Sequence, residues 1–330
     1  MFALNLPNTN MYEQLLQLDN VHLNFSAGGM HAINIVLAVV MFGVALGIKP
    51  REFITVFKHP KSVILGLTCQ WILLPAMTFL LAFLCKDFIT PMVAMGMILV
   101  ASCPGGNISN FMSSLSKANI ELSISLTAIT TSFAVVVTPL NFALWGGLYN
   151  KLVLTNSVLG QQTLQIDVLQ TFETVFILLG IPLVLGMLFV RYFPQLTERL
   201  KKPFQYFSLG FFLLMVILSF SNNFSLFLQY IGYIFVIVLV HNALALGIGY
   251  SVGSAFKLPF RDRRTITIET GIQNSGLGLV LLFNPKIFPP DLAIGGMLFV
   301  TAWWGIWHII SGLSISFLFN RSDQRKLANS

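Results

Sequence analysis

Charged residues are scarce in this sequence: Asp, Glu, Lys and Arg together make up only 9% of its 330 residues, whereas 55% are hydrophobic. A soluble domain carries roughly 25% charged residues, so this chain cannot cover a water-exposed surface in the usual way. The net charge of +7 does not indicate a nucleic-acid partner, because the basic residues lie in short loops between apolar stretches. That arrangement is typical of a protein that crosses a lipid bilayer several times.

Residues that build enzyme, metal or nucleotide sites are also missing. The chain has three cysteines that form no paired framework, and its five histidines are scattered without the spacing of metal ligands. Gly105 and Gly106 are not followed by the Lys-Ser/Thr of a phosphate-binding loop. We therefore expect no enzyme, no catalytic residue, no bound cofactor other than ions and no obligate protein partner.

Long apolar stretches dominate instead, and a helix needs about 20 mainly apolar residues to cross a bilayer. The sequence predicts an all-α membrane protein with about nine transmembrane helices. They would form a single domain over residues 31–320, between an extramembrane segment at 1–30 and a tail at 321–330. The predicted helices lie at 31–48, 62–84, 88–116, 119–145, 168–190, 203–222, 224–254, 265–285 and 291–319.

The basic residues predict the orientation of these helices, because cytoplasmic loops are enriched in Lys and Arg. With nine spans and the N-terminus outside, 16 of the 19 Lys and Arg residues lie on the cytoplasmic side. The outer loops then hold only Lys86, Lys151 and Lys286. We expect an integral protein of the cell membrane with its N-terminus outside and its C-terminus in the cytoplasm.

Two of the predicted spans contain interruptions. Pro104, Gly105 and Gly106 lie within the third span, and Gly271 and Gly276 bracket polar residues in the eighth. Proline removes a backbone donor, and glycine lets the chain leave helical geometry. In lipid, such irregular backbone is tolerated only where it is buried or lines a cavity.

The two interrupted spans are five spans apart and so cross the membrane in opposite directions. This pattern predicts an inverted repeat of four plus five helices, at about 31–148 and 166–320, with the two discontinuous helices crossing near the midplane. In the alternative interpretation the glycines only allow close helix packing. That alternative does not explain a glutamate, Glu269, within an apolar span.

Glu269 is the strongest candidate for a functional residue. An isolated carboxylate at membrane depth costs a few kcal/mol, so it must be paired, hydrated, protonated or bound to a cation. No Lys or Arg lies in the body of any predicted span. A bound cation is therefore favoured, with protonation as the alternative. Glu121 and Glu173 lie near the ends of their spans, where capping or water explains them.

Longer motifs around these residues resemble the bile acid:sodium symporter family. Cys103-Pro-Gly-Gly-Asn-Ile-Ser-Asn110 precedes Asn119-Ile-Glu-Leu-Ser-Ile-Ser-Leu-Thr127, and Thr267-Ile-Glu-Thr-Gly-Ile-Gln-Asn-Ser-Gly276 follows a basic segment. The loop Gly47-Ile-Lys-Pro-Arg-Glu-Phe53 matches as well. The resemblance extends from about residue 31 to the C-terminal region. It implies a bacterial homologue of the vertebrate carriers in a nine-span form, with a panel domain and a core domain.

The resemblance also implies two sodium ions as cofactors and a set of residues that hold them. The first sodium site would comprise Ser109, Asn110, Ser123, Thr127 and Glu269. The second would comprise Gln70, Glu269 and Gln273, with main-chain oxygens of Thr270 and Ile272. Substrate contacts would come from Asn107, Asn274 and His308, although the position of His308 favours a packed donor between helices over a pocket residue.

These residues predict a sodium-coupled symporter that imports a small organic anion by alternating access. Two sodium ions against one carboxylate leave excess positive charge, which favours an anion. The resemblance implies that this anion is an organic acid such as a bile acid, a steroid conjugate or a pantoate-like acid. The alternative within transport is a proton-coupled or efflux carrier that uses Glu269 as its proton site. An intramembrane enzyme would need paired acids or a His cluster, and a receptor needs no broken helices.

Overall fold

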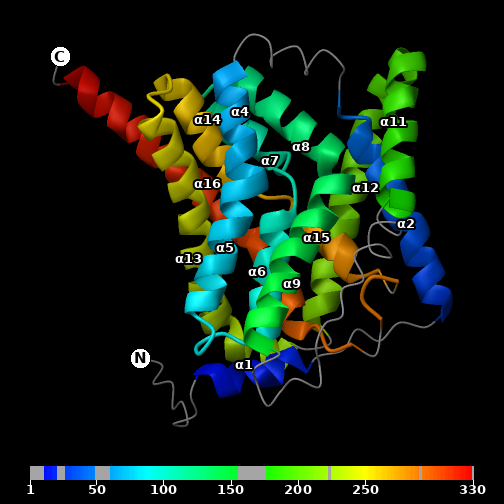
Figure 1. The fold of residues 1–330 in the computed structure, drawn as a ribbon. Helices are drawn as coiled ribbons and strands as arrows, with labels where there is room; N and C mark the ends of the chain where they lie inside the picture. The colour runs from blue at the N-terminus through cyan, green and yellow to red at the C-terminus, as the bar shows by residue number, and fades with distance from the viewer. Residues whose placement is uncertain are drawn as a thin grey trace.

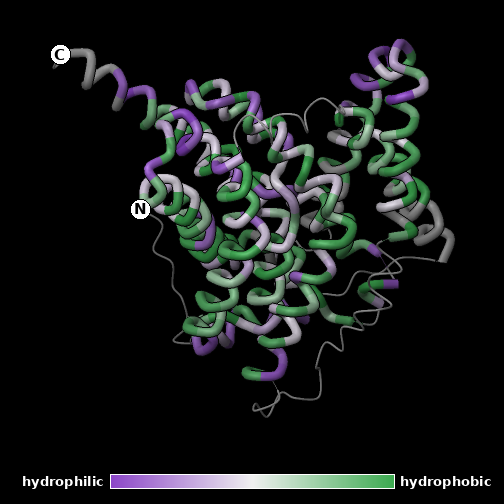
Figure 2. Tube along the Cα trace, turned by 45° about the horizontal axis from the view of Figure 1, so that its top comes forward, coloured by the Kyte–Doolittle hydropathy of each residue, from purple (hydrophilic) through white to green (hydrophobic). Residues whose placement is uncertain are grey.

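The computed structural model describes residues 11–20, 27–48, 60–154, 176–221, 224–284, 286–289 and 292–328, and in these ranges it contains helices and no β-strand. Hydrophobic residues fill the middle of the bundle and hydrophilic residues gather toward its ends (Figure 2). This confirms the all-helical prediction, while the nine spans and the inverted repeat stay predictions. Helices long and apolar enough to cross a membrane are Pro60–Leu84, Ile120–Val153, Leu228–Ala255 and Gly295–Arg321.

One group of helices lies apart on the right of Figure 1. It contains α2 (Ala27–Ala45), α11 (Ile181–Tyr192) and α12 (Pro194–Ser221), and α2 packs against both of the others. A Cβ added at Gly186 would lie 2.9 Å from the carbonyl oxygen of Phe42, so the absence of a side chain lets α11 and α2 approach closely. The first part of the predicted span at 168–190 lies outside the described residues. The described part begins with the π-helical turn η6 (Phe176–Gly180), which leads directly into α11.

The remaining helices form the larger group, in which α13 packs along α14 and α16 packs along α6. These two pairs are close because glycines lie in their interfaces: a Cβ added at Gly249 or Gly96 would lie within 2.7 Å of backbone atoms on the facing helix. The members are α4 (Pro60–Thr68), the π-helical turn η2 (Cys69–Leu73), α5 (Leu74–Leu84), α6 (Pro91–Ser102), α7 (Ile108–Leu115), α8 (Ile120–Asn141), α13 (Phe224–Ala255), α14 (Phe260–Gly271), α15 (Ser275–Leu282) and α16 (Gly295–Ala328). Beyond α8 the helical path continues through η3 (Phe142–Gly146), α9 (Gly147–Tyr149) and η4 (Asn150–Leu154), past the predicted end at 145.

Two helices are interrupted where the sequence predicts breaks. The first break separates α6 from α7, and the second separates α14 from α15. The two breaks pair with each other: the Asn274 amide donates to the Pro104 carbonyl oxygen at 2.8 Å, and the Gly106 amide donates to the Ile272 carbonyl oxygen at 2.8 Å. This pairing satisfies backbone groups that the helices leave free, which lipid could not do.

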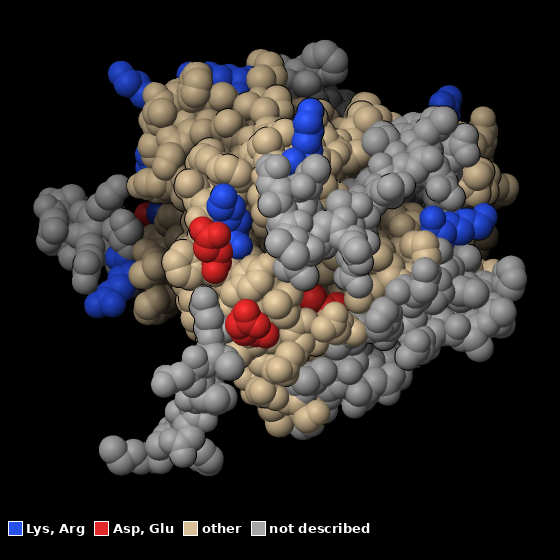
Figure 3. Space-filling view, turned by 60° about the horizontal axis from the view of Figure 1, so that its bottom comes forward, with Lys and Arg blue, Asp and Glu red and all other residues tan. Residues whose placement is uncertain are grey.

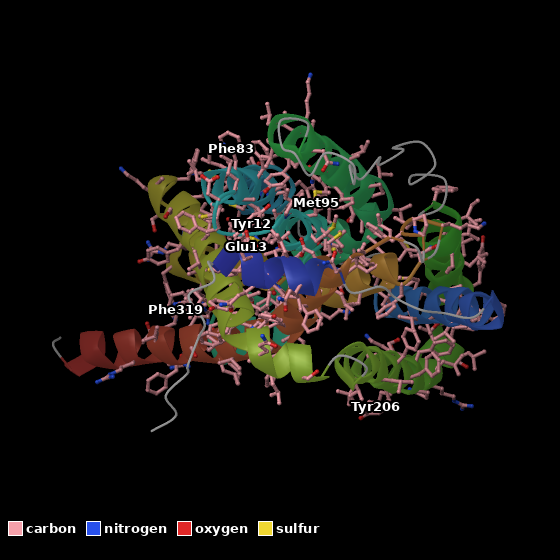
Figure 4. The ribbon with its side chains drawn as sticks, turned by 90° about the horizontal axis from the view of Figure 1, so that it is seen from below. Tyr12, Glu13, Phe83, Met95, Tyr206 and Phe319 are labelled. Carbon is pink, nitrogen blue, oxygen red and sulfur yellow. The ribbon has the colours of Figure 1, made fainter. Side chains whose placement is uncertain are left out.

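A short amphipathic helix, α1 (Met11–Asp19), lies across one end of the bundle (Figures 1 and 4). Leu15 and Leu18 are buried, and the Asp19 carboxylate accepts hydrogen bonds from Thr90 Oγ1 at 2.9 Å and the Met92 amide at 3.2 Å. Acidic side chains are visible near the middle of this end (Figure 3). Burial raises the pKa of Asp19 to about 7, against the two hydrogen bonds, which lower it.

The opposite end of the bundle is tied to the C-terminal helix. The guanidinium of Arg264 on α14 forms a bidentate pair with Asp323, at 2.6 and 2.9 Å, and also donates to the carbonyl oxygens of Ser116 and Phe319. Figure 4 shows Phe319 on the part of α16 that extends beyond the bundle. Helix α16 continues past these contacts to Ala328, so the tail expected from residue 321 begins inside a helix.

Candidate ion site

The carboxylate of Glu269 lies inside the bundle near the end of α14, with 0% of the residue exposed. Hydroxyl groups from α7 and α8 surround it. Ser109 Oγ and Ser123 Oγ each donate to Glu269 Oε1 at 2.5 Å, and Thr127 Oγ1 lies 3.1 Å from both carboxylate oxygens. Three helical segments therefore meet at a single acid.

Asn110 completes this cluster of oxygens. Its Oδ1 accepts from Ser123 Oγ at 2.9 Å and lies 3.4 Å from Thr127 Oγ1. Each hydroxyl has only one hydrogen, yet each lies within bonding distance of at least two other oxygens. The cluster is thus rich in oxygen and poor in hydrogen, which is the environment that a hard cation prefers. All five residues expected at the first sodium site are brought together here.

Gln70 approaches the same acid from the π-helical turn η2. A Cβ added at Gly105 would lie 2.8 Å from Glu269 Oε2 and 3.1 Å from Gln70 Oε1, so both oxygens face the first break. Gln70 Oε1 is buried and has no hydrogen-bond partner among the described residues. Such an oxygen is costly unless a ligand or cation satisfies it. Glycine at position 105 leaves the space that these two side chains occupy.

The other residues expected at the second site follow Glu269 around the break. Gln273 Nε2 donates to the main-chain oxygen of Thr270 at 2.9 Å, and the Ile272 oxygen accepts from the Gly106 amide at 2.8 Å. Gln273 Oε1 is buried without a partner in the described ranges. Each carbonyl oxygen has a second lone pair, so all three groups are able to coordinate a cation.

No Lys or Arg pairs with Glu269 in the part of the chain that the structure describes. The buried Arg264, also on α14, forms its ion pair with Asp323 instead. Glu121 is exposed near the start of α8, as expected, and Glu173 lies outside the described residues. The negative charge of Glu269 is therefore compensated by hydroxyl hydrogen bonds rather than by a basic side chain.

The residues expected to contact the substrate lie in three different environments. Asn107 is exposed immediately before α7. Asn274 is half-buried and its Oδ1 accepts from the Leu277 amide at 3.0 Å, which caps α15. His308, on α16, is buried inside the bundle with 5% of the residue exposed. Asn107 is the one of the three whose side chain is openly accessible.

Two asparagines that the sequence did not single out also reach the irregular backbone. Asn242 Nδ2 donates to the Gly271 carbonyl oxygen at 2.7 Å, and Asn141 Nδ2 donates to the Trp71 carbonyl oxygen at 2.9 Å. The second of these had a signal in the sequence. Pro75 stands four residues after Trp71 and has no amide hydrogen to donate to its carbonyl oxygen. A donor from another helix is therefore needed there.

This arrangement defines a class of protein. A buried acid surrounded by oxygens, at the point where two interrupted helices pair inside an apolar bundle, is typical of ion-coupled membrane transporters. The profile of the Sodium Bile acid symporter family matches residues 34–230, which is more than half of the chain. The chain therefore belongs to this family of integral-membrane, sodium-dependent transporters, whose members are not enzymes.

Individual relatives agree with the family assignment. "Uncharacterized sodium-dependent transporter YocS" of Bacillus subtilis (strain 168) is 28% identical over 298 residues, which cover 90% of this chain and 86% of the relative. Human "Sodium/bile acid cotransporter 4" is 28% identical over 307 residues, which cover 89% and 67%. The rice protein "Probable sodium/metabolite cotransporter BASS2, chloroplastic" is 27% identical over 277 residues, and the chain spans only 62% of its length.

Proposed function

We propose that this protein is a symporter that imports a small organic anion together with sodium ions. It lies in the cell membrane with its N-terminus outside and its C-terminus in the cytoplasm. The observation that carries this proposal is the fully buried Glu269, held by three hydroxyl groups and without a basic partner in the described residues. Such a group persists in an apolar bundle because a cation neutralises it during the transport cycle.

The first sodium ion binds in the cluster of Ser109, Asn110, Ser123, Thr127 and Glu269. Support comes from the six side-chain oxygens gathered there and from the shortage of hydrogens between them. A cation joins oxygens of α7, α8 and α14 that otherwise compete for three hydrogens. Sodium binding therefore links α7, the second half of the first broken helix, to α14, the first half of the second broken helix.

A second sodium ion binds between Gln70 and the break after α14. Support comes from the buried oxygens Gln70 Oε1 and Gln273 Oε1, which lack partners among the described residues. The main-chain oxygens of Thr270 and Ile272 complete this site. Glu269 is shared by both ions, so the pair of sites carries a net charge of about +1, which favours an anion beside it.

The anion binds where α7 and α15 begin. The N-terminal ends of both helices lie directly after the paired breaks, and the positive end of a helix dipole attracts negative groups. Asn107 and Asn274 flank this position, and His308 contributes from α16. Because the same breaks form the ion sites and the anion site, binding of one favours binding of the other, and the loaded core then alternates between the two sides of the membrane.

The names of the relatives suggest the chemical class of the anion. The human relative is a sodium/bile acid cotransporter and the rice relative a sodium/metabolite cotransporter. An amphipathic organic acid, such as a bile acid or a steroid conjugate, and a smaller metabolite acid, such as pantoate, are therefore the first candidates. The open Asn107 is compatible with either size, because its side chain is not enclosed by the bundle.

The experiment is a thermal-stability screen of the purified protein against organic acids, in sodium chloride and in potassium chloride at equal ionic strength. A ligand that binds only the native state raises the unfolding temperature by mass action. We expect at least one acid to stabilise the protein in sodium but not in potassium. Stabilisation that is equal in both salts and increases with acidity would favour the proton-coupled alternative, with Glu269 as the proton site.

A further inference from the structure

The second cation site is built on backbone that is not regular helix. Gln70 projects from the π-helical turn η2, and Thr270, Ile272 and Gln273 lie at the break that ends α14. Irregular backbone leaves carbonyl oxygens without their helical donors, and such segments are also the easiest to deform. The position of the coordinating oxygens therefore depends on what holds these two segments in place.

Asn242 holds the break. Its side chain is 1% exposed on α13, and its Nδ2 donates to the Gly271 carbonyl oxygen at 2.7 Å. Leu246, one turn further along α13, packs directly against the α-carbon of Gly271. The carbonyl at position 271 lies between the two main-chain oxygens expected to bind sodium. Fixing it fixes the peptide plane between residues 271 and 272, which lies between the two planes that carry those oxygens.

The neighbour of Asn242 connects the same helix to the span that carries Gln70. His241 Nε2 lies 2.8 Å from Thr78 Oγ1 on α5, which continues directly from η2. The His241 ring also packs on Trp304 of α16, with ring centroids 4.7 Å apart. These contacts make α13 a common support for the second break and for the helix that contains Gln70.

Asn141 holds the other ligand-bearing segment. Pro75 has no amide hydrogen, so the carbonyl oxygen of Trp71 loses its helical donor, and Asn141 Nδ2 replaces it at 2.9 Å. Trp71 follows Gln70 directly in the π-helical turn. The orientation of the Gln70 side chain toward Glu269 therefore depends on a donor from the end of α8.

We propose that Asn141 and Asn242 are positioning residues of the second sodium site, each of which holds one ligand-bearing segment through a side-chain amide to a main-chain carbonyl. The proposal rests on the two sodium sites proposed above. Neither asparagine coordinates the ion; each acts through the backbone that presents the coordinating oxygens. The opposing interpretation is that both bonds only contribute to helix packing and have no particular effect on sodium.

Sodium titration of the purified protein distinguishes the two interpretations. The unfolding temperature is measured as sodium replaces potassium at constant ionic strength, for the unmodified protein, Asn141→Leu and Asn242→Leu. Asn320→Leu is the matched control, because Asn320 Nδ2 also donates to a main-chain oxygen, that of Leu115, at 2.8 Å, but at the end of α7 remote from Glu269. Leucine keeps the branched shape of asparagine, although its two methyl groups are larger than the amide, and it donates no hydrogen bond.

If the proposal is right, each of the two variants requires about five- to tenfold more sodium for half of the stabilisation, as expected for the loss of one buried hydrogen bond. Saturating sodium then restores the full temperature increment, and the control keeps the unmodified midpoint. A lowered unfolding temperature in potassium with an unchanged sodium midpoint would overturn it, and so would variants that do not fold in saturating sodium. An unmodified protein that does not respond to sodium would instead contradict the proposed function itself.

Discussion

Replacing Glu269 by glutamine removes the charge of the site and retains its shape. The amide oxygen can still accept from Ser109 and Ser123, which lie 2.5 Å from Oε1. The amide nitrogen would take the place of Oε2, where Thr127 Oγ1 can accept one of its hydrogens. The Glu269→Gln protein should therefore fold, and it should be at least as stable as the unmodified protein without sodium, because no charge is left buried.

The effect on sodium should be large. A cation about 2.4 Å from a carboxylate oxygen is attracted by about 7 kcal/mol at an effective dielectric constant of about 20. Desolvation of both ions offsets part of this attraction. Removing one member of a buried ion pair costs about 3–5 kcal/mol in proteins. We therefore expect the sodium affinity to fall roughly a hundredfold to a few thousandfold.

The assay is again the unfolding temperature as sodium replaces potassium at constant ionic strength. The unmodified protein should be stabilised by sodium, and Glu269→Gln should show almost no response in the same range. Glu121→Gln is the control, because Glu121 is an exposed glutamate near the start of α8. A Glu269→Gln protein that responds to sodium with the unmodified midpoint would refute the assignment of this acid as the sodium ligand.

Three further substitutions test separate parts of the structure. Gly105→Ala adds a Cβ 2.8 Å from Glu269 Oε2 and should weaken sodium binding by about 1–3 kcal/mol, measured by sodium titration. Gly232→Ala is the control, because no atom lies within 4 Å of the added Cβ, and it should leave sodium binding unchanged. Ser123→Ala removes one oxygen of the cluster and should raise the sodium midpoint about tenfold in the same titration; an unchanged midpoint would place the ion elsewhere. Asp19 has a pKa of about 7 in the folded protein, above its ordinary value of 3.8, so its contribution to stability is present at low pH and is lost as the pH rises through 7. Asp19→Asn should flatten the dependence of unfolding temperature on pH between about 4 and 7, and equal slopes in both proteins would contradict the burial of this acid.

The sequence alone was sufficient to predict the breaks and their acid. Pro104 with Gly105 and Gly106 cannot continue a helix, and a glutamate without a basic neighbour in an apolar span must find a polar environment. The spacing of Ser123 and Thr127, four residues apart, also places both hydroxyls on one face of α8, where the structure has them. These features are determined by residues that are close together in the sequence, so they can be predicted from it.

Features that depend on the register between distant helices could not be predicted. Asn242 meets Gly271 because two glycine-containing helices pack closely, and no pattern within either helix specifies that contact. The ion pair between Arg264 and Asp323 joins α14 to α16, and no pattern in the sequence links these two residues, which are 59 positions apart. The N-terminal helix α1 was expected only as an extramembrane segment, because its burial depends on helix ends that are distant in sequence.

The most direct test of the account is uptake of the stabilising acid into proteoliposomes that contain the purified protein. With sodium outside and potassium inside, the unmodified protein should accumulate the acid, and Glu269→Ala should not. Replacing external sodium by potassium should abolish uptake. Accumulation at the full rate without sodium, or driven by a pH gradient alone, would contradict the claim that sodium ions neutralise Glu269 where the two broken helices pair.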